Sequence, residues 1–131
     1  QIADALDKRF AKGLNGARIL LMGMAYKKNV DDIRESPAFK LIELLAEKQA
    51  QVDYYDPFVP VIPKTREHGQ LAGIKSVKWS PRAFARYDAV LVCTDHDQVD
   101  YAAMVKHSRL VIDSRNATKS VRTHRDRIVL A

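Results

Sequence analysis

At 131 residues, with 47% hydrophobic and 29% charged side chains, the chain is long enough for one domain around one continuous core, and this composition argues against disorder. A formal charge of +6 would suit an anionic partner such as a nucleotide or a nucleic acid. No apolar run approaches the roughly 20 residues of a membrane span, and the first residues lack the pattern of a signal peptide, so we expect a cytoplasmic protein with no membrane partner. The single cysteine, Cys93, is expected to be a buried core thiol.

The first half of the chain predicts a helix, a strand, a second helix and a second strand. Residues 1–14 place apolar side chains at helical spacing, and they are expected to be the end of a helix that begins elsewhere. Residues 17–25 are apolar nearly without alternation, as in a central parallel strand that is covered on both faces. Residues 36–50 predict a helix with Ser36 as its N-cap, and residues 51–57 predict the next strand.

The second half repeats the alternation of strands and helices. Residues 58–73 have no clear period and hold two prolines, so we expect irregular structure there. The pattern then predicts a strand at 76–80, a short helix at 81–86, a strand at 88–94, a helix at 101–108, a strand at 109–115 and a weak helix at 120–126. Repeated strand–helix–strand units favour parallel pairing with helices on both faces. We therefore predict an α/β fold with a doubly wound parallel sheet in three α/β/α layers.

Ligands of such sheets bind at the carboxyl ends of the strands, where this sequence places polar residues. The turn after the first strand holds only Gly23, so the G-x-G-x-x-G fingerprint of a phosphate loop is absent. Side chains of Lys27, Lys28 and Arg34 are available instead to contact phosphate oxygens. Spacing alone leaves a second interpretation open, in which these cations pair on the surface with neighbouring carboxylates.

Two further polar residues at this edge have structural interpretations that we favour. Asp56 stands where a dinucleotide-binding fold places its ribose carboxylate, but without the glycine motif a role in the Asp-Pro turn is the safer prediction. His96 lies between Asp95 and Asp97, and consecutive loop residues do not present two ligands to one metal as a helical pair does. We predict that His96 is a polar residue at the surface or cleft edge, with neither a metal nor a catalytic role.

Four blocks of the sequence together resemble one known family. They are "GARILLMGMAYKKNVDDIRESPAFKLIELL", "VDYYDP", "DAVLVCTDHD" and "VIDSRNA". In this order they closely resemble the C-terminal UDP-binding domain of the UDP-glucose/GDP-mannose dehydrogenase family, over about Leu14 to Lys119. The resemblance implies a Rossmann-like fold for residues 16–131, with residues 1–15 as the end of the family's central linker helix. It also implies an NAD-dependent oxidation of a nucleotide sugar at C6 to its uronic acid, with NAD reduced twice.

The resemblance also implies roles for individual residues. Tyr26 and Lys27 match the aromatic–lysine pair that lines the nucleotide-sugar site, and Arg115 matches an arginine that contacts the UDP part of the substrate. Arg34 matches the arginine that reaches towards NAD, which is bound mainly by an N-terminal domain that this sequence lacks. The family's catalytic cysteine block is also missing, and Cys93 does not correspond to it. The chain by itself is therefore expected to be inactive, and its full-length enzyme to be a homodimer or larger.

The sequence leaves alternatives for the identity of the sugar substrate and for the class of protein. The blocks look closer to the bacterial UDP-N-acetylhexosamine 6-dehydrogenases than to the UDP-glucose enzymes, although the sugar is recognised mainly by other domains of the family. In the parent enzyme the product would serve polysaccharide synthesis. A free-standing nucleotide-binding regulatory module is the second hypothesis. A nucleic-acid-binding domain is the third, and it predicts affinity that falls steeply with salt.

Overall fold

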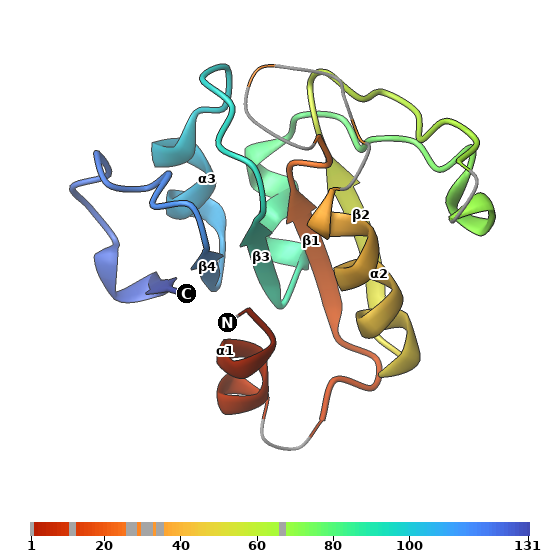
Figure 1. Cartoon of the computed structure of the whole chain (residues 1–131). Helices are drawn as coiled ribbons and strands as arrows, with labels where there is room; N and C mark the ends of the chain where they lie inside the picture. Colours follow the sequence, from red (N-terminus) through yellow and green to blue (C-terminus); the bar gives the residue numbers. More distant parts are fainter. Residues whose placement is uncertain (1, 11–12, 26–28, 30–32, 34–35, 66–67) are drawn as a thin grey trace.

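The computed structural model describes residues 2–10, 13–25, 29, 33, 36–65 and 68–131 (Figure 1). Its helices and strands are α1 (Ile2–Arg9), β1 (Arg18–Met22), α2 (Pro37–Glu47), β2 (Gln51–Tyr55), β3 (Ala89–Val92), α3 (Tyr101–His107), β4 (Val111–Asp113) and β5 (Ile128–Leu130). Short 3₁₀ turns are η1 (Gly69–Leu71), η2 (Pro81–Arg86) and η3 (Arg125–Arg127). Within these described residues, no helix is long and apolar enough to cross a bilayer.

The described strands form one parallel sheet in the order β2-β1-β3-β4-β5. Its register pairs Ile19 of β1 with Val52 of β2 on one side and with Ala89 of β3 on the other. The chain moves outward from β1 to β2, then returns past β1 to β3 and continues in the other direction. The order of the strands therefore reverses between β1 and β3, and in open parallel sheets this point marks the ligand side.

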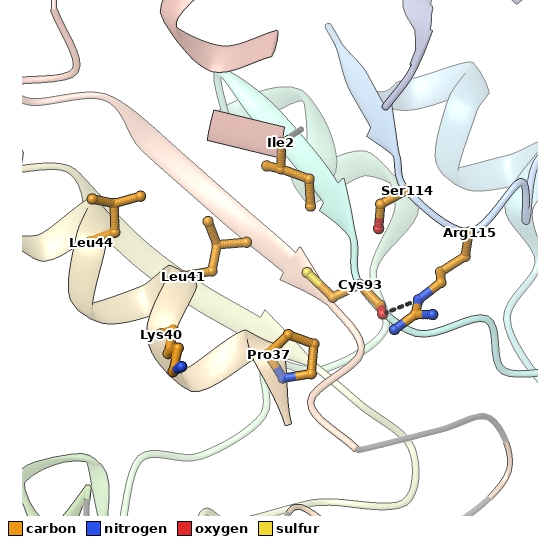
Figure 2. Close-up of a pocket in the computed structure, with 8 residues that line it drawn as sticks. All are labelled: Ile2, Pro37, Lys40, Leu41, Leu44, Cys93, Ser114 and Arg115. Atoms are coloured by element: carbon orange, nitrogen blue, oxygen red, sulfur yellow. Dashed lines mark hydrogen bonds between the residues drawn. The ribbon is translucent and has the colours of Figure 1, made fainter. Parts of the chain in front are cut away.

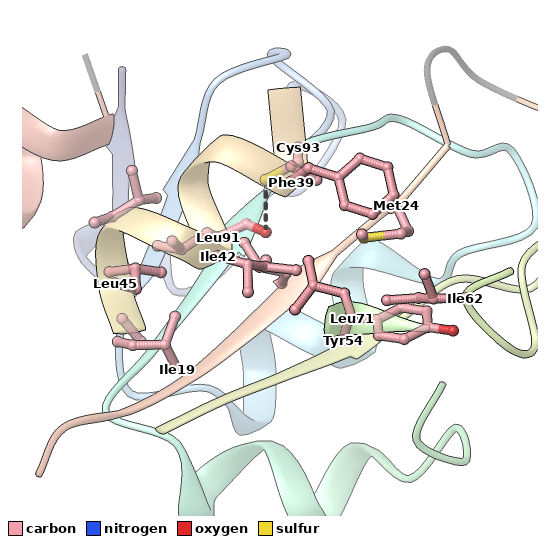
Figure 3. Close-up of a cluster of buried hydrophobic side chains, with 14 of the residues drawn as sticks. Ile19, Met24, Phe39, Ile42, Leu45, Tyr54, Ile62, Leu71, Leu91 and Cys93 are labelled. Atoms are coloured by element: carbon pink, nitrogen blue, oxygen red, sulfur yellow. Dashed lines mark hydrogen bonds between the residues drawn. The ribbon is translucent and has the colours of Figure 1, made fainter. Parts of the chain in front are cut away.

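Successive strand residues point to opposite faces of the sheet, so each strand contributes side chains to two separate clusters. Different helices cover these two clusters. On one face, Ile19 of β1 and Leu91 of β3 pack against Ile42 and Leu45 of α2 (Figure 3). Leu21 of β1 and Leu6 of α1 belong to the same cluster. On the other face, Leu20 and Met22 pack with residues of η2 and α3. The predicted three-layer, doubly wound Rossmann-like fold is confirmed.

Helix α2 starts where the sequence predicts. Ser36 has extended backbone angles, and its hydroxyl accepts a hydrogen bond from the amide of Ala38 at 3.3 Å, while Pro37 occupies the first turn. Phe39, Ile42 and Leu45 then point to the sheet, and Leu45 is fully buried. Burying one such leucine contributes about 1.5–3 kcal/mol relative to an exposed one. This packing fixes the start of α2 beside the carboxyl ends of the central strands.

Three predictions of secondary structure differ from the structure. Residues 76–80 form no strand: the Val77 amide donates one hydrogen bond to the Tyr54 carbonyl at 2.9 Å, and no ladder continues from it. The fifth strand is instead β5, which forms the opposite edge of the sheet in a segment where we predicted no strand. The weak helix predicted at 120–126 is replaced by the turn η3, and the first helix ends at Arg9, before the predicted residue 14.

Candidate functional site

A pocket of about 520 Å³ opens at the carboxyl ends of β3 and β4, on the face that α1 and α2 cover (Figure 2). Its walls are mostly apolar and come from both helices, and its polar groups lie where β3 and β4 end. The lining residues are Ile2, Pro37, Lys40, Leu41, Leu44, Cys93, Ser114 and Arg115. An apolar hollow with a few polar groups at one rim is the usual form of a small-molecule site.

Arg115 is the sequence-predicted site residue that the structure describes, and it lies at this rim. Its side chain is exposed, and its Nε atom donates to the Cys93 carbonyl at 3.0 Å (Figure 2). The bond anchors the inner nitrogen of the guanidinium to the end of β3. Among the described residues, the two terminal nitrogens have no hydrogen-bond partner, and a planar pair of such donors matches two oxygens of a phosphate or carboxylate.

Asp113, the last residue of β4, holds the turn that carries Arg115. Its Oδ1 atom accepts from the amides of Arg115 at 2.9 Å and Ala117 at 3.2 Å, and its Oδ2 atom accepts from the amide and hydroxyl of Thr118. The carboxylate is buried, and these donors satisfy it. The backbone of Arg115 is thus fixed before any ligand arrives.

Asp56 holds the turn after β2, as Asp113 holds the turn after β4. Its Oδ2 atom accepts from the amides of Met24 at 2.7 Å and Ala25 at 2.9 Å, which follow β1, and its Oδ1 atom accepts from the Phe58 amide at 2.8 Å. Burial is the largest influence on its pKa and raises it, but hydrogen bonds from His96 and from three backbone amides together outweigh burial, so the pKa of Asp56 lies below its ordinary value. The predicted turn role is confirmed, and these bonds leave Asp56 pointing inward.

His96 is the residue that the sequence-based interpretation misplaced. It is fully buried, so the prediction of a surface or cleft-edge residue was wrong. Its Nε2 atom lies 2.9 Å from Oδ2 of Asp56, and its Nδ1 atom accepts from the Asn29 amide at 2.7 Å. A histidine in a polar loop gives no periodic signal of burial. The apolar partner that covers it, Phe58, comes from a segment without a recognisable pattern.

Three sequence-predicted site residues, Tyr26, Lys27 and Arg34, lie outside the described residues. The structure does describe both ends of their loop and two residues between them, Asn29 and Ile33. Gly23 to Ala25 leave β1 against Thr94, Asn29 is bound to His96, and Ser36 caps α2. The loop that carries these three side chains therefore starts and ends at the same edge of the sheet as Arg115.

Cys93 also lines the pocket, but its thiol is not a nucleophile at neutral pH. Burial raises its pKa to about 12, although the neighbouring Arg115 opposes part of this shift. The prediction of a core thiol is confirmed. Over the described part of the chain, no group of three or more histidine, cysteine, aspartate or glutamate residues is placed to hold a metal ion.

A doubly wound parallel sheet with an anchored arginine at its carboxyl edge defines a ligand-binding domain of the Rossmann-like class. Residues 20–120 match the UDP binding domain of the UDP-glucose/GDP-mannose dehydrogenase family. The chain therefore belongs to this family, as the four sequence blocks indicated.

Individual relatives agree with this assignment. UDP-glucose 6-dehydrogenase AglM of Haloferax volcanii is 35% identical over 120 residues, which cover 88% of this chain and 26% of the relative. UDP-N-acetyl-D-glucosamine 6-dehydrogenase of Salmonella typhi is 33% identical over 89 residues, 66% of this chain and 20% of the relative. The solved UDP-D-ManNAc dehydrogenase of Pyrococcus horikoshii superposes with a TM-score of 0.67 at 26% identity, over 98% of this chain and 28% of that one. This chain thus spans about a quarter of the length of its relatives.

Proposed function

We propose that this chain is the domain that holds the substrate nucleotide in an NAD-dependent UDP-sugar 6-dehydrogenase. In this proposal, residues 16–131 form the UDP-binding domain. Residues 1–15, in which helix α1 spans Ile2–Arg9, are the end of the segment that links this domain to the remainder of the enzyme. The enzyme oxidises a UDP-N-acetylhexosamine or UDP-glucose to its uronic acid and reduces two NAD. The support is the family match over residues 20–120, together with three relatives, described above, that are each named as dehydrogenases of a UDP-sugar.

The observation that carries the proposal is the position of Arg115. It stands at the rim of the pocket, its backbone fixed by Asp113 and its Nε atom by the Cys93 carbonyl, with its terminal nitrogens turned to no other described residue. A diphosphate between this guanidinium and the side chains of Tyr26 and Lys27 would be held from two loops. Charge-assisted hydrogen bonds of this kind contribute about 1.5–3 kcal/mol each.

NAD does not fit this domain as its main site. The sequence has no glycine fingerprint, and Asp56, at the position of a ribose carboxylate, has its oxygens occupied by His96 and by the amides of Met24, Ala25 and Phe58. We therefore assign NAD mainly to another domain of the enzyme, with Arg34 as the contact from this chain. We also assign the catalytic groups to other domains of the enzyme; Cys93 is a buried core thiol, and burial raises its pKa to about 12. The proposed enzyme is cytoplasmic and at least a homodimer.

The direct test is a titration of the 131-residue chain with UDP, followed by amide resonances, with NAD and pyrophosphate as comparison ligands. Even a Kd near 1 mM, about −4 kcal/mol, is measurable in this way. We expect saturable shifts at Arg115, Tyr26 and Lys27 that are larger for UDP than for pyrophosphate and persist at physiological salt. Shifts that scatter over the surface and disappear with salt would indicate a non-specific polyanion surface and overturn the proposal.

A matched pair of variants makes the test specific. Arg115→Gln removes the guanidinium at the pocket rim, and we expect it to weaken UDP at least about tenfold. Arg82→Gln removes an equally exposed arginine from η2, which packs against the other face of the sheet, and it should leave UDP affinity unchanged. Equal losses in both variants would show that net charge, rather than this site, attracts the ligand.

A further inference from the structure

Asn29, in the loop between β1 and α2, is held from inside the protein by His96, and we propose that His96 is the residue that positions this loop for the nucleotide. Its ring, fixed in one tautomer by Asp56, accepts the hydrogen bond of Asn29, which belongs to the same loop of the sequence as Tyr26 and Lys27. The inference rests on the proposed function, because nucleotide affinity is one of its readouts.

The partners of the ring determine which nitrogen carries the proton. A backbone amide only donates, so Nδ1, which receives the Asn29 amide at 2.7 Å, must present a lone pair. The hydrogen of the neutral ring is then on Nε2, which lies 2.9 Å from Oδ2 of Asp56 and donates to it. Asp56 therefore selects the one neutral tautomer that is able to accept from Asn29.

Asn29 is gripped by its side chain as well as by its backbone. Its Nδ2 atom donates to Oδ2 of Asp97 at 2.8 Å, and its Oδ1 atom accepts from the Asp97 amide at 3.0 Å. Its backbone is left-handed, with φ of 59°. Two consecutive residues, His96 and Asp97, thus hold one loop residue at three points, across about half of the sequence.

The ring itself has little freedom to move. It is fully buried, its centroid lies 5.0 Å from that of Phe58, and its own amide donates to the hydroxyl of Tyr101 at 3.1 Å. Asp56, on its other side, is held by the amides of Met24 and Ala25. The contact to Asn29 is therefore made by a group that is itself held from several sides, and it fixes the position of the Asn29 backbone.

The contact is observable without any substitution. In a uniformly ¹⁵N-labelled chain, we expect His96 to show the Nε2–H tautomer and a nitrogen–nitrogen coupling between Nδ1 and the Asn29 amide across their hydrogen bond. An Nδ1–H tautomer, or absence of this coupling at neutral pH, would overturn the proposal whatever the chain binds. A residue that merely fills the core would not require either signature.

Two variants test the hydrogen bonds of the two ring nitrogens one at a time. His96→Gln places a donor amide near the position of Nε2 and keeps the bond to Asp56, but it removes the acceptor for Asn29. His96→Asn places an acceptor oxygen near the position of Nδ1 and keeps Asn29, but it no longer reaches Asp56. We expect His96→Gln to weaken UDP about three- to tenfold, and His96→Asn to bind UDP more tightly than His96→Gln.

The experiment needs one control for loss of folding and another for failure of the proposed function. Both variants lose one buried hydrogen bond, so UDP affinity is compared only for samples whose amide spectra show a folded core. Unchanged UDP affinity in a folded His96→Gln variant would refute the positioning role. If the wild-type chain itself fails to bind UDP, the proposed function fails, whereas the tautomer and the coupling still decide whether His96 holds the loop.

Discussion

Gly23, directly after β1, lies so close to Thr94, which follows β3, that there is no room for a side chain on Gly23. A Cβ atom built on Gly23 would lie 2.5 Å from the Cβ atom of Thr94, and the backbone of Gly23 has φ of +102°. The Thr94 hydroxyl donates to the Ala25 carbonyl at 2.8 Å, so the two strand ends are also bonded. This close approach joins the carboxyl ends of β1 and β3, where the strand order reverses.

Substitution of Gly23 therefore tests how closely the two strand ends must pack. Gly23→Ala adds both a clash and an unfavourable backbone conformation, and we expect a loss of about 2–5 kcal/mol in the free energy of unfolding. Gly73→Ala is the matched control, because Gly73 also has positive φ, 87°, but its Cβ would meet no atom within 4 Å. We expect that control to lose only about 1–2 kcal/mol in urea denaturation. Equal losses would show that backbone strain alone, and not contact with Thr94, explains the requirement for glycine.

Asp56 makes stability depend on pH in a defined direction. Its pKa is lower in the folded chain, so its stabilising effect is complete above the pKa of the unfolded state, about 3.9, and is lost as the pH falls through the lower folded pKa. Asp56→Asn removes the charge from a site with four donors, and we expect it to cost about 3–5 kcal/mol at pH 7. The measurement is the free energy of unfolding between pH 3 and pH 7 for the two proteins.

The pH range separates this effect from a general loss of packing. The wild type should lose stability towards acid more steeply than Asp56→Asn, so the two curves should converge at low pH. Asp126→Asn, at an exposed carboxylate, serves as the control and should follow the wild-type curve. A constant gap between Asp56→Asn and the wild type over the whole range would contradict the assignment of a lowered pKa to Asp56.

Arg115 should not tolerate lysine, although the charge is the same. Arg115→Lys loses the Nε bond to the Cys93 carbonyl and replaces a planar fork by a mobile point charge. We expect UDP affinity to fall about three- to tenfold. The free energy of unfolding should change by less than about 1 kcal/mol, since the side chain is exposed. A lysine variant with wild-type affinity would mean that charge alone, without the anchored geometry, determines binding.

Cys93 should resist alkylation in the folded protein. With a pKa raised to about 12 by burial, its thiolate fraction at pH 8 is on the order of one in ten thousand. We expect reaction with iodoacetamide at pH 8 to be slow in buffer and fast in urea, as followed by intact mass. Rapid labelling of the native chain would show that the pocket beside Cys93 opens more widely than the structure indicates.

Much of the fold is present in local sequence patterns. The apolar run that becomes β1 and the Ser36 cap of α2 are signals within a few residues, and the structure confirms both. The segment at 76–80 shows the limit of this reasoning. It has the composition of a strand, but Trp79 packs between Tyr55 and Phe84, and the backbone makes a single bond to β2 at Val77. Strand formation depends on a partner edge, which composition does not describe.

The sequence by itself determined the α/β class and the family, because these depend on periodicity and on ordered residue blocks. It also predicted Arg115 as a site residue, and the structure places Arg115 at the rim of the pocket. The tertiary structure alone decided what Asp56 and His96 do. They are separated by 40 positions, and their burial, tautomer and shared contact with the β1–α2 loop arise only when β1, β2 and β3 end side by side. Burial removes water from both groups, so each must find its hydrogen-bond partner in the protein, and no local pattern records which partner that will be.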